Sequence, residues 1–541
     1  MRAKVLYQQI FKEKIWIGIF VLIVIGAILR IGSCFYGYPY RLHSDEHVIV
    51  KNAIDILSRH TYEPADAEWP AHLLMKLSAL IFEIFSRLYY EMPAVEAFGE
   101  HATVFYVLSR LIVMVFGVLM IPLSYVICEE IYPKSGKYAA TLVTIFPIFV
   151  VHSGYATPDI PLTFMTMLVS YLSMQYLKKD NNKYLYAICI ATGIAITIKY
   201  TAGILCLIIA AIICIKYWKN AKLDIVKYGM LSILIVIASF FFLAPNLFTN
   251  WQLTLDTLVY QSRDSHLGMG SLGFLGNLKY YLDCYIKNIG WLGLIFTIAG
   301  IAGVLKKTEN KMNFIGLGVG FIFWVSISVL ALHWERWGLP VYVTFVMLAG
   351  IGVCHLIKEI FIRESRGIYA RLKVILGSAF VTVFVMTLLS FTITYFAKCT
   401  VVTCESRIVA LEFCKNNNIV EEESIYEGYT PFFMEQPKGL ELTLDSEGKL
   451  VFLDDKNNIK YIILSSSMYG RYYNEAERYP EQVAVYDKIR SDYELIYTTP
   501  LIQPQSSNWS VMKIIYNIKY IYDMIVEGRC YGSVIQIYKI N

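Results

Sequence analysis

Apolar segments long enough to cross a lipid bilayer recur along most of this sequence, and they constrain the fold more than any other feature. A helix needs about 20 predominantly apolar residues to span the hydrocarbon layer. Of the 541 residues, 56% are hydrophobic and only 17% are charged, a composition that soluble globular proteins of this length do not have. The sequence therefore predicts an α-helical polytopic membrane protein.

The apolar segments predict about eleven membrane spans. The first span lacks a small-residue cleavage site and many further spans follow it, so we interpret it as a retained anchor and not as a signal peptide. The expected spans, with boundaries set to within several residues, are 16–29, 104–127, 138–151, 158–177, 184–198, 201–215, 227–244, 288–305, 313–332, 338–357 and 373–396.

Lysine and arginine residues gather in alternate loops between these spans. They lie in the N-terminal flank and in the loops near 134–137, 178–183, 216–227, 306–311 and 358–373. Because cytoplasmic loops are rich in Lys and Arg, we expect the first long loop and the tail after residue 397 to lie outside, at the plasma membrane of a prokaryotic host. The net charge of +5 follows from this bias and gives no reason to expect a nucleic-acid partner.

Two amphipathic helices are expected in the first long outer loop, which runs from Cys34 to His101. Apolar residues recur there at the spacing of a helix face: Val50, Ala53, Ile54 and Leu57, then Leu73, Leu77, Leu80, Ile81 and Ile84. The first helix would cover 45–59, and Trp69 and Pro70 would introduce the second. Helices of this kind suit the plane of the membrane interface.

Acidic residues follow two of the predicted membrane segments on the outer side. Asp45 and Glu46 stand in the run His43-Ser44-Asp45-Glu46-His47, and Asp159 stands at the outer mouth of the fourth span. Each is compatible with a helix start, where Ser44 would be the cap and the macrodipole favours acids in the first turn. Each is equally compatible with a catalytic site, because carboxylates at membrane segments are usually functional. The residues alone leave both interpretations open.

Basic residues occur on the outer side at two further points, where positive charge is otherwise avoided. Lys199 interrupts an apolar stretch, which indicates either a side chain reaching to the interface or a phosphate contact. Arg336 follows Glu335 in the turn between the ninth and tenth spans. This pair is either an exposed ion pair of little energetic value or the source of a guanidinium for a phosphate.

The second long outer loop, at 244–288, contains polar and aromatic residues followed by glycines. Tyr260, Arg263 and His266 are candidates for a substrate pocket, as are His43, His47, His333 and Glu335 on the other outer segments. The glycines at 268, 270, 273 and 276 supply turns, or they permit a mobile loop over a pocket.

After residue 397 the composition becomes that of a soluble protein, so we divide the chain into a membrane domain, 1–396, and an external α/β domain, 397–541. Helices are expected at 406–415 and 482–491, and strands at 460–465 and 533–539. The run Ser465-Ser466-Ser467 is interpreted as a strand end, because no frame of a serine nucleophile surrounds it. Four cysteines would lie outside, where disulfides form, but their spacing does not pair them: Cys399, Cys404, Cys414 and Cys530.

A succession of short motifs along the chain resembles GT-C glycosyltransferases of the family-39 kind. This group includes protein O-mannosyltransferases and bacterial aminoarabinose transferases that act on lipid A. The motifs are the runs at 43–47, 155–162, 198–201 and 335–340, all expected on the outer side, and the tail run at 467–472. Their order and spacing, more than any single motif, carry the resemblance, which spans nearly the whole chain.

The resemblance implies transfer of a monosaccharide from a polyprenyl-phosphate donor to an acceptor hydroxyl, with inversion at the sugar. Asp45 matches the position of the general base, with Glu46 as a supporting or acceptor-side group and Asp159 as a further acid of the site. Lys199 and Arg336 would neutralise the leaving phosphate. No cofactor is then required, although Asp45, Glu46 and Asp159 together have the chemistry to hold a divalent metal.

One departure from the family pattern leaves the acceptor open. Aminoarabinose transferases carry a Lys-Pro pair before the second interfacial helix, and here Trp69 precedes Pro70. The acceptor is therefore a protein, a lipid or a glycan. Two alternatives to an enzyme are a polytopic transporter and a non-catalytic membrane scaffold with an external binding domain. A transporter would place its ionisable residues near the bilayer midplane and show two similar halves, and the sequence shows neither.

Overall fold

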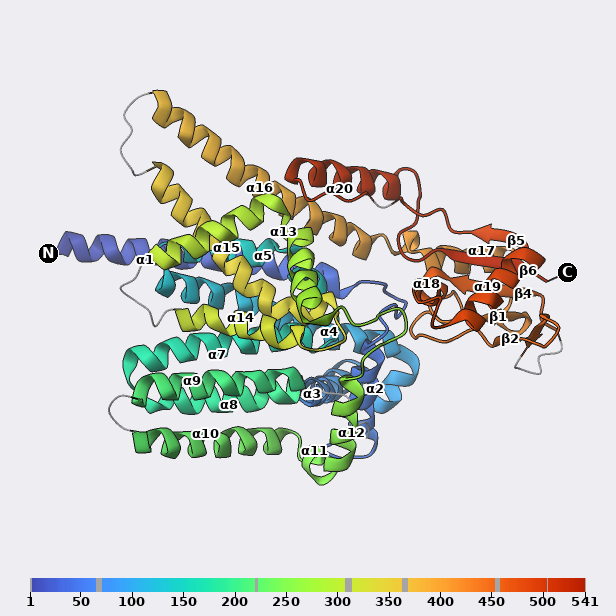
Figure 1. Cartoon of the computed structure of the whole chain (residues 1–541), viewed down its shortest axis with the longest axis horizontal. Coiled ribbons are helices and arrows are strands. Elements are labelled where there is room, and N and C mark those ends of the chain that lie inside the picture. The colour runs from blue at the N-terminus through green and yellow to red at the C-terminus, as the bar shows by residue number, and fades with distance from the viewer. Residues whose placement is uncertain are drawn as a thin grey trace.

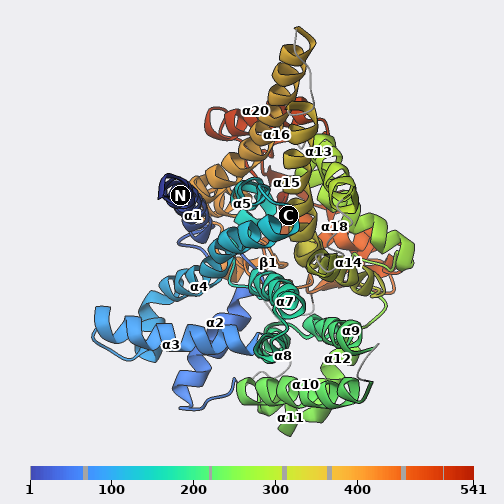
Figure 2. The same cartoon turned by 90° about the vertical axis from the view of Figure 1, so that its left-hand side faces the viewer.

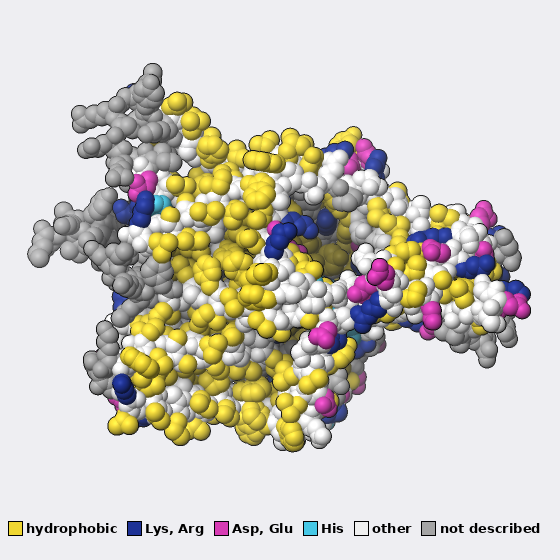
Figure 3. Space-filling view, viewed as in Figure 1, with side chains coloured by type: hydrophobic (Ala, Val, Ile, Leu, Met, Phe, Trp, Pro, Cys, Tyr) yellow, Lys and Arg dark blue, Asp and Glu magenta, His cyan; other side chains and the backbone are white. Residues whose placement is uncertain are grey.

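The computed structural model describes residues 2–64, 71–218, 222–306, 314–361, 368–452, 458–503 and 505–540. Long helices form a bundle at one end of the molecule, and a smaller domain that contains the strands lies at the other end (Figure 1). Apolar side chains dominate the surface of the bundle, whereas charged side chains are spread over the smaller domain (Figure 3). This division agrees with the predicted helical membrane protein carrying a small α/β domain.

Each of the predicted spans coincides with a helix or a bent pair of helices. In chain order these are α1 (Arg2–Cys34), α4 (Ala94–Ile131), α5 (Gly136–Ile145) with α6 (Pro147–Ser153), α7 (Asp159–Lys179), α8 (Asn182–Ile198), α9 (Leu205–Tyr217), α10 (Lys222–Leu243), α13 (Gly273–Lys306), α14 (Phe314–Ser328), α15 (Leu339–Phe361) and α16 (Ile368–Thr400). In the described part of the chain, eight helices are long and apolar enough to cross a membrane, and α5 with α6, bent by 56°, would be a ninth. The helices α8 and α14 are apolar but shorter than that length.

The bend between α5 and α6 follows from Pro147. A residue before proline is pushed out of the helical region, and Phe146 accordingly has an extended backbone. The break leaves the last carbonyls of α5 without helical N–H partners. Arg30 of α1, which is fully buried, donates to the carbonyls of Val143 at 2.9 Å and Thr144 at 3.0 Å. The guanidinium thus replaces the missing helical donors.

Both helices predicted in the first outer loop are present, as α2 (Glu46–Ser58) and α3 (His72–Tyr89). They project sideways from the bundle when it is viewed end-on (Figure 2). The predicted cap is displaced by one residue, because Asp45 and not Ser44 is the N-cap of α2, and no side-chain cap bond is formed there. The Ser44 hydroxyl instead donates to Asp45 Oδ1 at 3.1 Å. Trp69 and Pro70 lie outside the described residues.

The second outer loop is less open than its glycines suggested. It contains two short helices, α11 (Asn246–Thr249) and α12 (Trp251–Gln261), before α13 begins at Gly273. The backbone between α12 and α13 forms an isolated bridge between His266 and Met269.

The C-terminal domain is built on a four-stranded sheet of order β1-β4-β6-β5. Strand β1 (Ser424–Tyr426) runs parallel to β4 (Tyr461–Ser465), while β6 (Ile535–Lys539) is antiparallel to β4 and to β5 (Glu494–Thr498). A small second sheet pairs β2 (Leu442–Leu444) with β3 (Leu450–Phe452). The helices are α17 (Ser406–Asn416), α18 (Ser466–Asn474) and α19 (Pro480–Asp492).

All four elements predicted for this domain are confirmed, as α17, α19, β4 and β6. Ser465 ends β4 and caps α18, as the strand-end interpretation requires, because its side chain accepts from the N–H of Ser467. The four outer cysteines are free thiols. Sequence analysis missed α20 (Ser510–Ile525), which leaves the domain and packs along α16. The predicted domain boundary at 396/397 falls in the last turns of α16, which continues to Thr400.

Helices α13 and α15 cross at very close range, and glycines make this possible. A Cβ atom on Gly300 would lie 1.9 Å from the carbonyl oxygen of Leu348, and one on Gly352 would lie 1.8 Å from that of Phe296. Small residues allow such backbone contact between membrane helices. Because α15 follows directly on the turn that carries Arg336, this contact also fixes one wall of the site described below.

Gly352→Ala is expected to lower the stability of the folded protein, by about 1–3 kcal/mol for an overpacked core, because α13 and α15 must separate. Thermal unfolding in detergent measures the loss. Gly229→Ala in α10 is the matched control, since nothing lies within 4 Å of its Cβ position. Equal unfolding temperatures for the two variants would contradict the close packing.

Candidate active site

Four of the predicted charged residues meet at one end of the bundle, in two ion pairs. Asp45 at the start of α2 pairs with Arg336, which lies in a 3-10 turn (Glu335–Gly338) just before α15. Asp159, the first residue of α7, accepts from Lys199 Nζ at 2.6 Å, and Lys199 directly follows α8. Helix ends are rigid mounts, so these charges are held by four different elements.

The two ion pairs belong to one electrostatic cluster. Arg336 acts on Asp159 as well as on Asp45, and Lys199 is influenced by Asp45 in addition to its own partner. The Lys199 ammonium also lies 5.3 Å from the ring centre of Trp337. The sequence also allowed Lys199 to extend to the membrane interface and Arg336 to form an exposed ion pair with Glu335. The geometry shows neither, because each cation pairs with a carboxylate from another segment.

The pKa of Asp45 is set by two opposing influences. Burial by itself would raise it, but the Arg336 guanidinium, with smaller contributions from His43 and the Ser44 hydroxyl, brings the pKa well below its usual range. Asp45 is thus ionised at neutral pH while Arg336 stays beside it. Burial is also the largest influence on His43, whose pKa is lowered, and its Nδ1 accepts from the Asp45 N–H at 3.3 Å.

Glu46 occupies a different environment from its neighbour Asp45. Its carboxylate is fully buried and accepts from Arg110 Nε at 2.8 Å, from Arg110 Nη2 at 2.6 Å and from the Ala156 N–H at 2.8 Å. The Glu46 side chain is not exposed to solvent, and the groups that donate to it belong to the protein. This position suits a supporting group beneath the site and not a group that contacts the acceptor. It joins α2 to α4 and to the turn that precedes Asp159.

Arg110 is the residue of this network that sequence analysis missed. Beyond Glu46, its Nη1 donates to the carbonyls of Cys34 at 2.9 Å and Tyr36 at 2.7 Å, at the end of α1. The signal was available, because an arginine inside an apolar span is rare and is usually functional or paired. Its partner was not evident, since Glu46 lies 64 residues earlier in the chain.

The histidines of the first loop have local partners. The His43 ring contacts the Tyr155 ring, with 4.4 Å between the centres, and thus joins the segment of Asp45 to that of Asp159. The His47 Nδ1–H donates to the Ser44 carbonyl at 2.6 Å, which closes the first turn of α2. Both side chains therefore brace the backbone around Asp45.

The remaining pocket candidates fall into two groups. In the first group, Arg263 donates to the Tyr260 carbonyl at 2.9 Å and contacts His266 Nδ1 at 3.0 Å. The centre of the His266 ring lies 5.7 Å from that of Trp334, which stands two residues before Arg336. The Tyr260 side chain itself is exposed.

His333 and Glu335 are instead engaged by α13. The His333 ring lies 4.5 Å from that of Tyr280, and Glu335 Oε1 accepts from Asn288 Nδ2 at 2.7 Å. These two residues fasten the turn that carries Arg336.

The C-terminal domain borders this site directly. Arg407 donates to the carbonyl of Leu42, three residues before Asp45, and Arg41 forms an ion pair with Glu435 at 2.7 Å. Tyr429 of this domain, which sequence analysis missed, interacts electrostatically with Arg336 and accepts from Arg471 Nη2 at 3.4 Å. Arg471 belongs to the tail run 467–472 that carries part of the resemblance.

The second outer loop is also tied to this domain. The Gly268 N–H donates to Glu475 Oε2 at 2.9 Å, at the end of α18. The site is therefore bordered by the bundle, by this loop and by the C-terminal domain.

The three acids considered for a divalent metal do not share one set of ligands. Glu46 is taken up by Arg110, and Asp159 and Asp45 are held by Lys199 and Arg336. Within the described ranges, no group of three or more His, Cys, Asp or Glu side chains is arranged to hold a metal ion.

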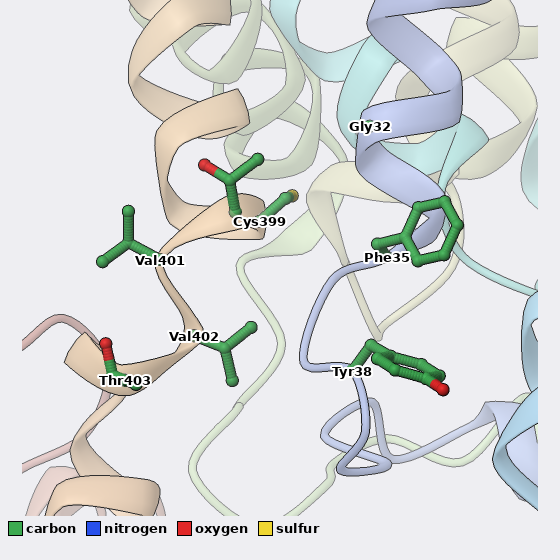
Figure 4. Close-up of a pocket in the computed structure, with 8 residues that line it drawn as sticks. Gly32, Phe35, Tyr38, Cys399, Val401, Val402 and Thr403 are labelled. Atoms are coloured by element: carbon green, nitrogen blue, oxygen red, sulfur yellow. The ribbon is translucent and has the colours of Figure 1, made fainter.

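A cavity of about 440 Å³ lies elsewhere, between the end of α1 and the end of α16. Figure 4 shows Phe35 and Tyr38 facing Val402 across it, with Cys399 and Gly32 above. None of the charged residues of the ion-pair cluster lines this cavity. The candidate active site is therefore the ion-pair cluster and not this cavity.

Glu46 and Arg110 are expected to be strongly coupled. Removing one partner leaves a buried unpaired charge, which costs about 3–5 kcal/mol, whereas replacing both by apolar residues removes that penalty. Glu46→Leu and Arg110→Met should each lower the unfolding temperature in detergent more than the double variant does. Additive losses in this double-mutant cycle would contradict the coupling.

Comparison with known proteins supports the fold. Residues 98–242 match the family model described as dolichyl-phosphate-mannose-protein mannosyltransferase. No curated protein sequence matches the chain.

Several solved structures are similar. The archaeal oligosaccharyltransferase AglB from Archaeoglobus fulgidus, in complex with an inhibitory peptide and a dolichol-phosphate, has 11% identity and a TM-score of 0.51, covering 98% of this chain and 89% of its own. The apo form of the Archaeoglobus fulgidus oligosaccharyltransferase has 12% identity and a TM-score of 0.50, covering 91% and 74%. ArnT from Cupriavidus metallidurans bound to undecaprenyl phosphate has 12% identity and a TM-score of 0.49, covering 85% and 94%.

The fold expected from the motif resemblance is thereby confirmed, and the conclusion rests on the family match together with the AglB likeness, which extends over nearly the whole chain. The chain has the fold of the GT-C glycosyltransferases, and over residues 98–242 it is similar to the dolichyl-phosphate-mannose-protein mannosyltransferases.

Proposed function

We propose that this protein is a membrane glycosyltransferase that moves a monosaccharide from a polyprenyl-phosphate donor to an acceptor hydroxyl on the outer face of the membrane. The observation that carries the proposal is the pair of carboxylate–cation contacts, Asp45 with Arg336 and Asp159 with Lys199, at one end of a GT-C bundle. The family match and the AglB structure, which holds a dolichol-phosphate, support a lipid-phosphate donor.

Charge balance suggests how the donor would be received. Each of the two cations is paired with a carboxylate of the chain. A lipid-linked phosphate competes with Asp45 for Arg336, because a guanidinium binds phosphate oxygens in a two-pronged geometry. Lys199 adds a second positive charge, and Asp159 holds it in place.

The same exchange would turn Asp45 into a better base. When Arg336 turns to the phosphate, Asp45 loses the partner that depresses its pKa, and burial then raises the pKa toward a useful value. Asp45 accepts the proton of the acceptor hydroxyl as its oxygen attacks the anomeric carbon. The new carbon–oxygen bond forms on the face opposite the phosphate, and the bond to the phosphate breaks with its electron pair. The sugar is therefore inverted.

The acceptor would approach from the side of the C-terminal domain. Tyr429 of the domain interacts electrostatically with Arg336 and contacts Arg471. His266 of the second outer loop contacts Arg263 and the ring of Trp334, which stands two residues before Arg336. These side chains would orient the acceptor, while the His43–Tyr155 contact and the Glu46–Arg110 pair keep the catalytic segments aligned.

Asp45→Asn should lower the transfer rate by about 10²–10⁴, the usual contribution of a general base. The measurement is the transfer of radiolabelled sugar from a polyprenyl-phosphate donor in membranes that contain the variant, with total cell-envelope material as acceptor. The control is Asp55→Asn on the same helix, whose carboxylate forms an exposed pair with Arg59 and should be dispensable. Undiminished transfer by Asp45→Asn would refute the assignment.

Arg336→Gln should move the acid limb of the pH profile of kcat/KM to higher pH. Arg336 holds the pKa of Asp45 down, so without it burial prevails and Asp45 becomes protonated at a higher pH. The maximal kcat/KM should fall as well, but the pH at which kcat/KM drops to half of that maximum can still be measured. Lys199→Gln, which removes the partner of Asp159, is the comparison variant and should shift the limb less. An unmoved limb in Arg336→Gln would contradict Asp45 as the titrating base.

A further inference from the structure

The long connection between β5 and β6, here termed the hairpin, leaves the C-terminal domain, contacts the bundle and returns through the helix α20. Its base is held by a bridge between Leu501 and Cys530, where the Ile502 N–H donates to the Cys530 carbonyl at 2.9 Å and the Cys530 N–H donates to the Pro500 carbonyl at 2.8 Å. The strands on either side are neighbours in the sheet. The hairpin, with α20 as its returning arm, is thus anchored in the C-terminal domain at its base, and Cys404 Sγ donates to the Met524 carbonyl near the end of α20.

The tip of the hairpin contacts the membrane bundle. The Trp291 N–H of α13 donates to the Asn508 carbonyl at 2.9 Å, next to the kink of α13 at Gly290. The Thr387 hydroxyl of α16 donates to the Ser510 carbonyl at 3.4 Å. Thr387 precedes the end of α16 at Thr400 by 13 residues, which is about 20 Å of helix. The first turn of α20 therefore lies well below the outer end of α16.

Further contacts keep α20 alongside α16 over its length. Asn517 Nδ2 donates to Ser390 Oγ at 3.0 Å, and the Lys398 ammonium lies 4.4 Å from the ring centre of Tyr520. In both Figure 1 and Figure 2, α20 lies beside α16 on the periphery of the bundle. It is 16 residues long and includes Lys513, Lys519 and Asp523, so it does not qualify as a span.

The two faces of α20 are arranged in the reverse of a helix from a soluble domain. Its buried side chains are Ser510, Lys513, Asp523 and Met524, and the Lys513 ammonium donates to the Lys287 carbonyl of α13. Eight apolar side chains of the helix and of the residues that flank it are 37% to 68% exposed: Trp509, Val511, Met512, Ile515, Ile518, Tyr522, Ile525 and Val526. Residues 511, 515, 518, 522 and 525 follow the spacing of one helix face.

This apolar face adjoins the exposed apolar surface of helices that are long and apolar enough to span a membrane. Exposed apolar residues on the spanning helices beside it include Met386 and Ile393 of α16 and Trp291 of α13. Trp509 at the tip and Trp291 of α13 are both exposed. An exposed apolar surface of this extent is unfavourable in water and marks a site of contact with a protein or a membrane.

We infer that α20 is a membrane anchor: its exposed apolar face contacts the acyl chains of the leaflet on the side of the C-terminal domain, with the Trp509 end deepest. The hairpin thereby ties the C-terminal domain to the bilayer. This inference stands apart from the proposed function, because it concerns a surface to which none of the four ion-pair residues belongs and predicts lipid contact whether or not the protein transfers sugar.

Photo-crosslinking tests the inference. A photoreactive phenylalanine analogue is placed at Ile515 or Ile518 of the full-length protein, which is reconstituted into vesicles of phospholipid with radiolabelled acyl chains. Phe380 on the exposed side of α16 is the positive reference, and Leu495 on β5 is the negative one. We expect lipid adducts at both α20 positions with a yield similar to that at Phe380, and only background at Leu495.

Two outcomes would overturn the inference. Background lipid labelling at Ile515 and Ile518, as at Leu495, would place this face in water. A crosslink to a second copy of the chain in place of lipid would make it a protein interface. Because the substituted side chains are exposed and apolar, the analogue should not disturb folding. A lipid adduct from the Phe380 variant, reconstituted in parallel, confirms that the protein inserts correctly.

Discussion

The buried ion pair between Glu46 and Arg110 is the interaction on which the arrangement of the candidate site depends. It brings together the end of α1, the start of α2, the middle of α4 and the turn before α7. Two charges buried among apolar helices are expensive unless each is fully paired. The guanidinium and the carboxylate here satisfy each other and three backbone groups besides. The segments that supply them are therefore held in one relative position, and the neighbouring acids inherit that position.

The acids that face the site differ from Glu46 in what pairs with them. Asp45 and Asp159 are held by Arg336 and Lys199, which lie at the ends of other helices. In the proposed function a phosphate takes the place of Asp45 beside Arg336, Asp159 keeps Lys199 in position, and the Glu46–Arg110 pair beneath is unchanged. The fully buried pair is thus separate from the two cations proposed for the phosphate. This separation is the physical basis for assigning a phosphate-binding role to one pair of cations only.

Much of this arrangement could be predicted from the sequence, because several of its signals are local. Charges that interrupt or follow apolar runs identified Asp45, Asp159, Lys199 and Arg336, and periodicity located α2 and α3. What escaped was the pairing. A charge pattern does not say that Arg110 meets Glu46 across 64 residues, or that Arg336 leaves its neighbour Glu335 for Asp45.

The helix α20 escaped for a related reason. Sequence patterns are normally interpreted with polar residues outward, so a helix with Lys513 and Asp523 suggests a soluble domain. Here both residues are buried, with Lys513 bound to α13, while Val511, Ile515, Ile518, Tyr522 and Ile525 are exposed. Which side of a helix is solvent depends on tertiary contacts, and these are absent from the sequence.

The structure of this protein with a polyprenyl phosphate bound tests the central claim most directly. The account predicts that the phosphate contacts Arg336 and Lys199 and that Asp45 is released from Arg336, while the Glu46–Arg110 pair is unchanged. A phosphate bound elsewhere, with the contact between Asp45 and Arg336 intact, would contradict it.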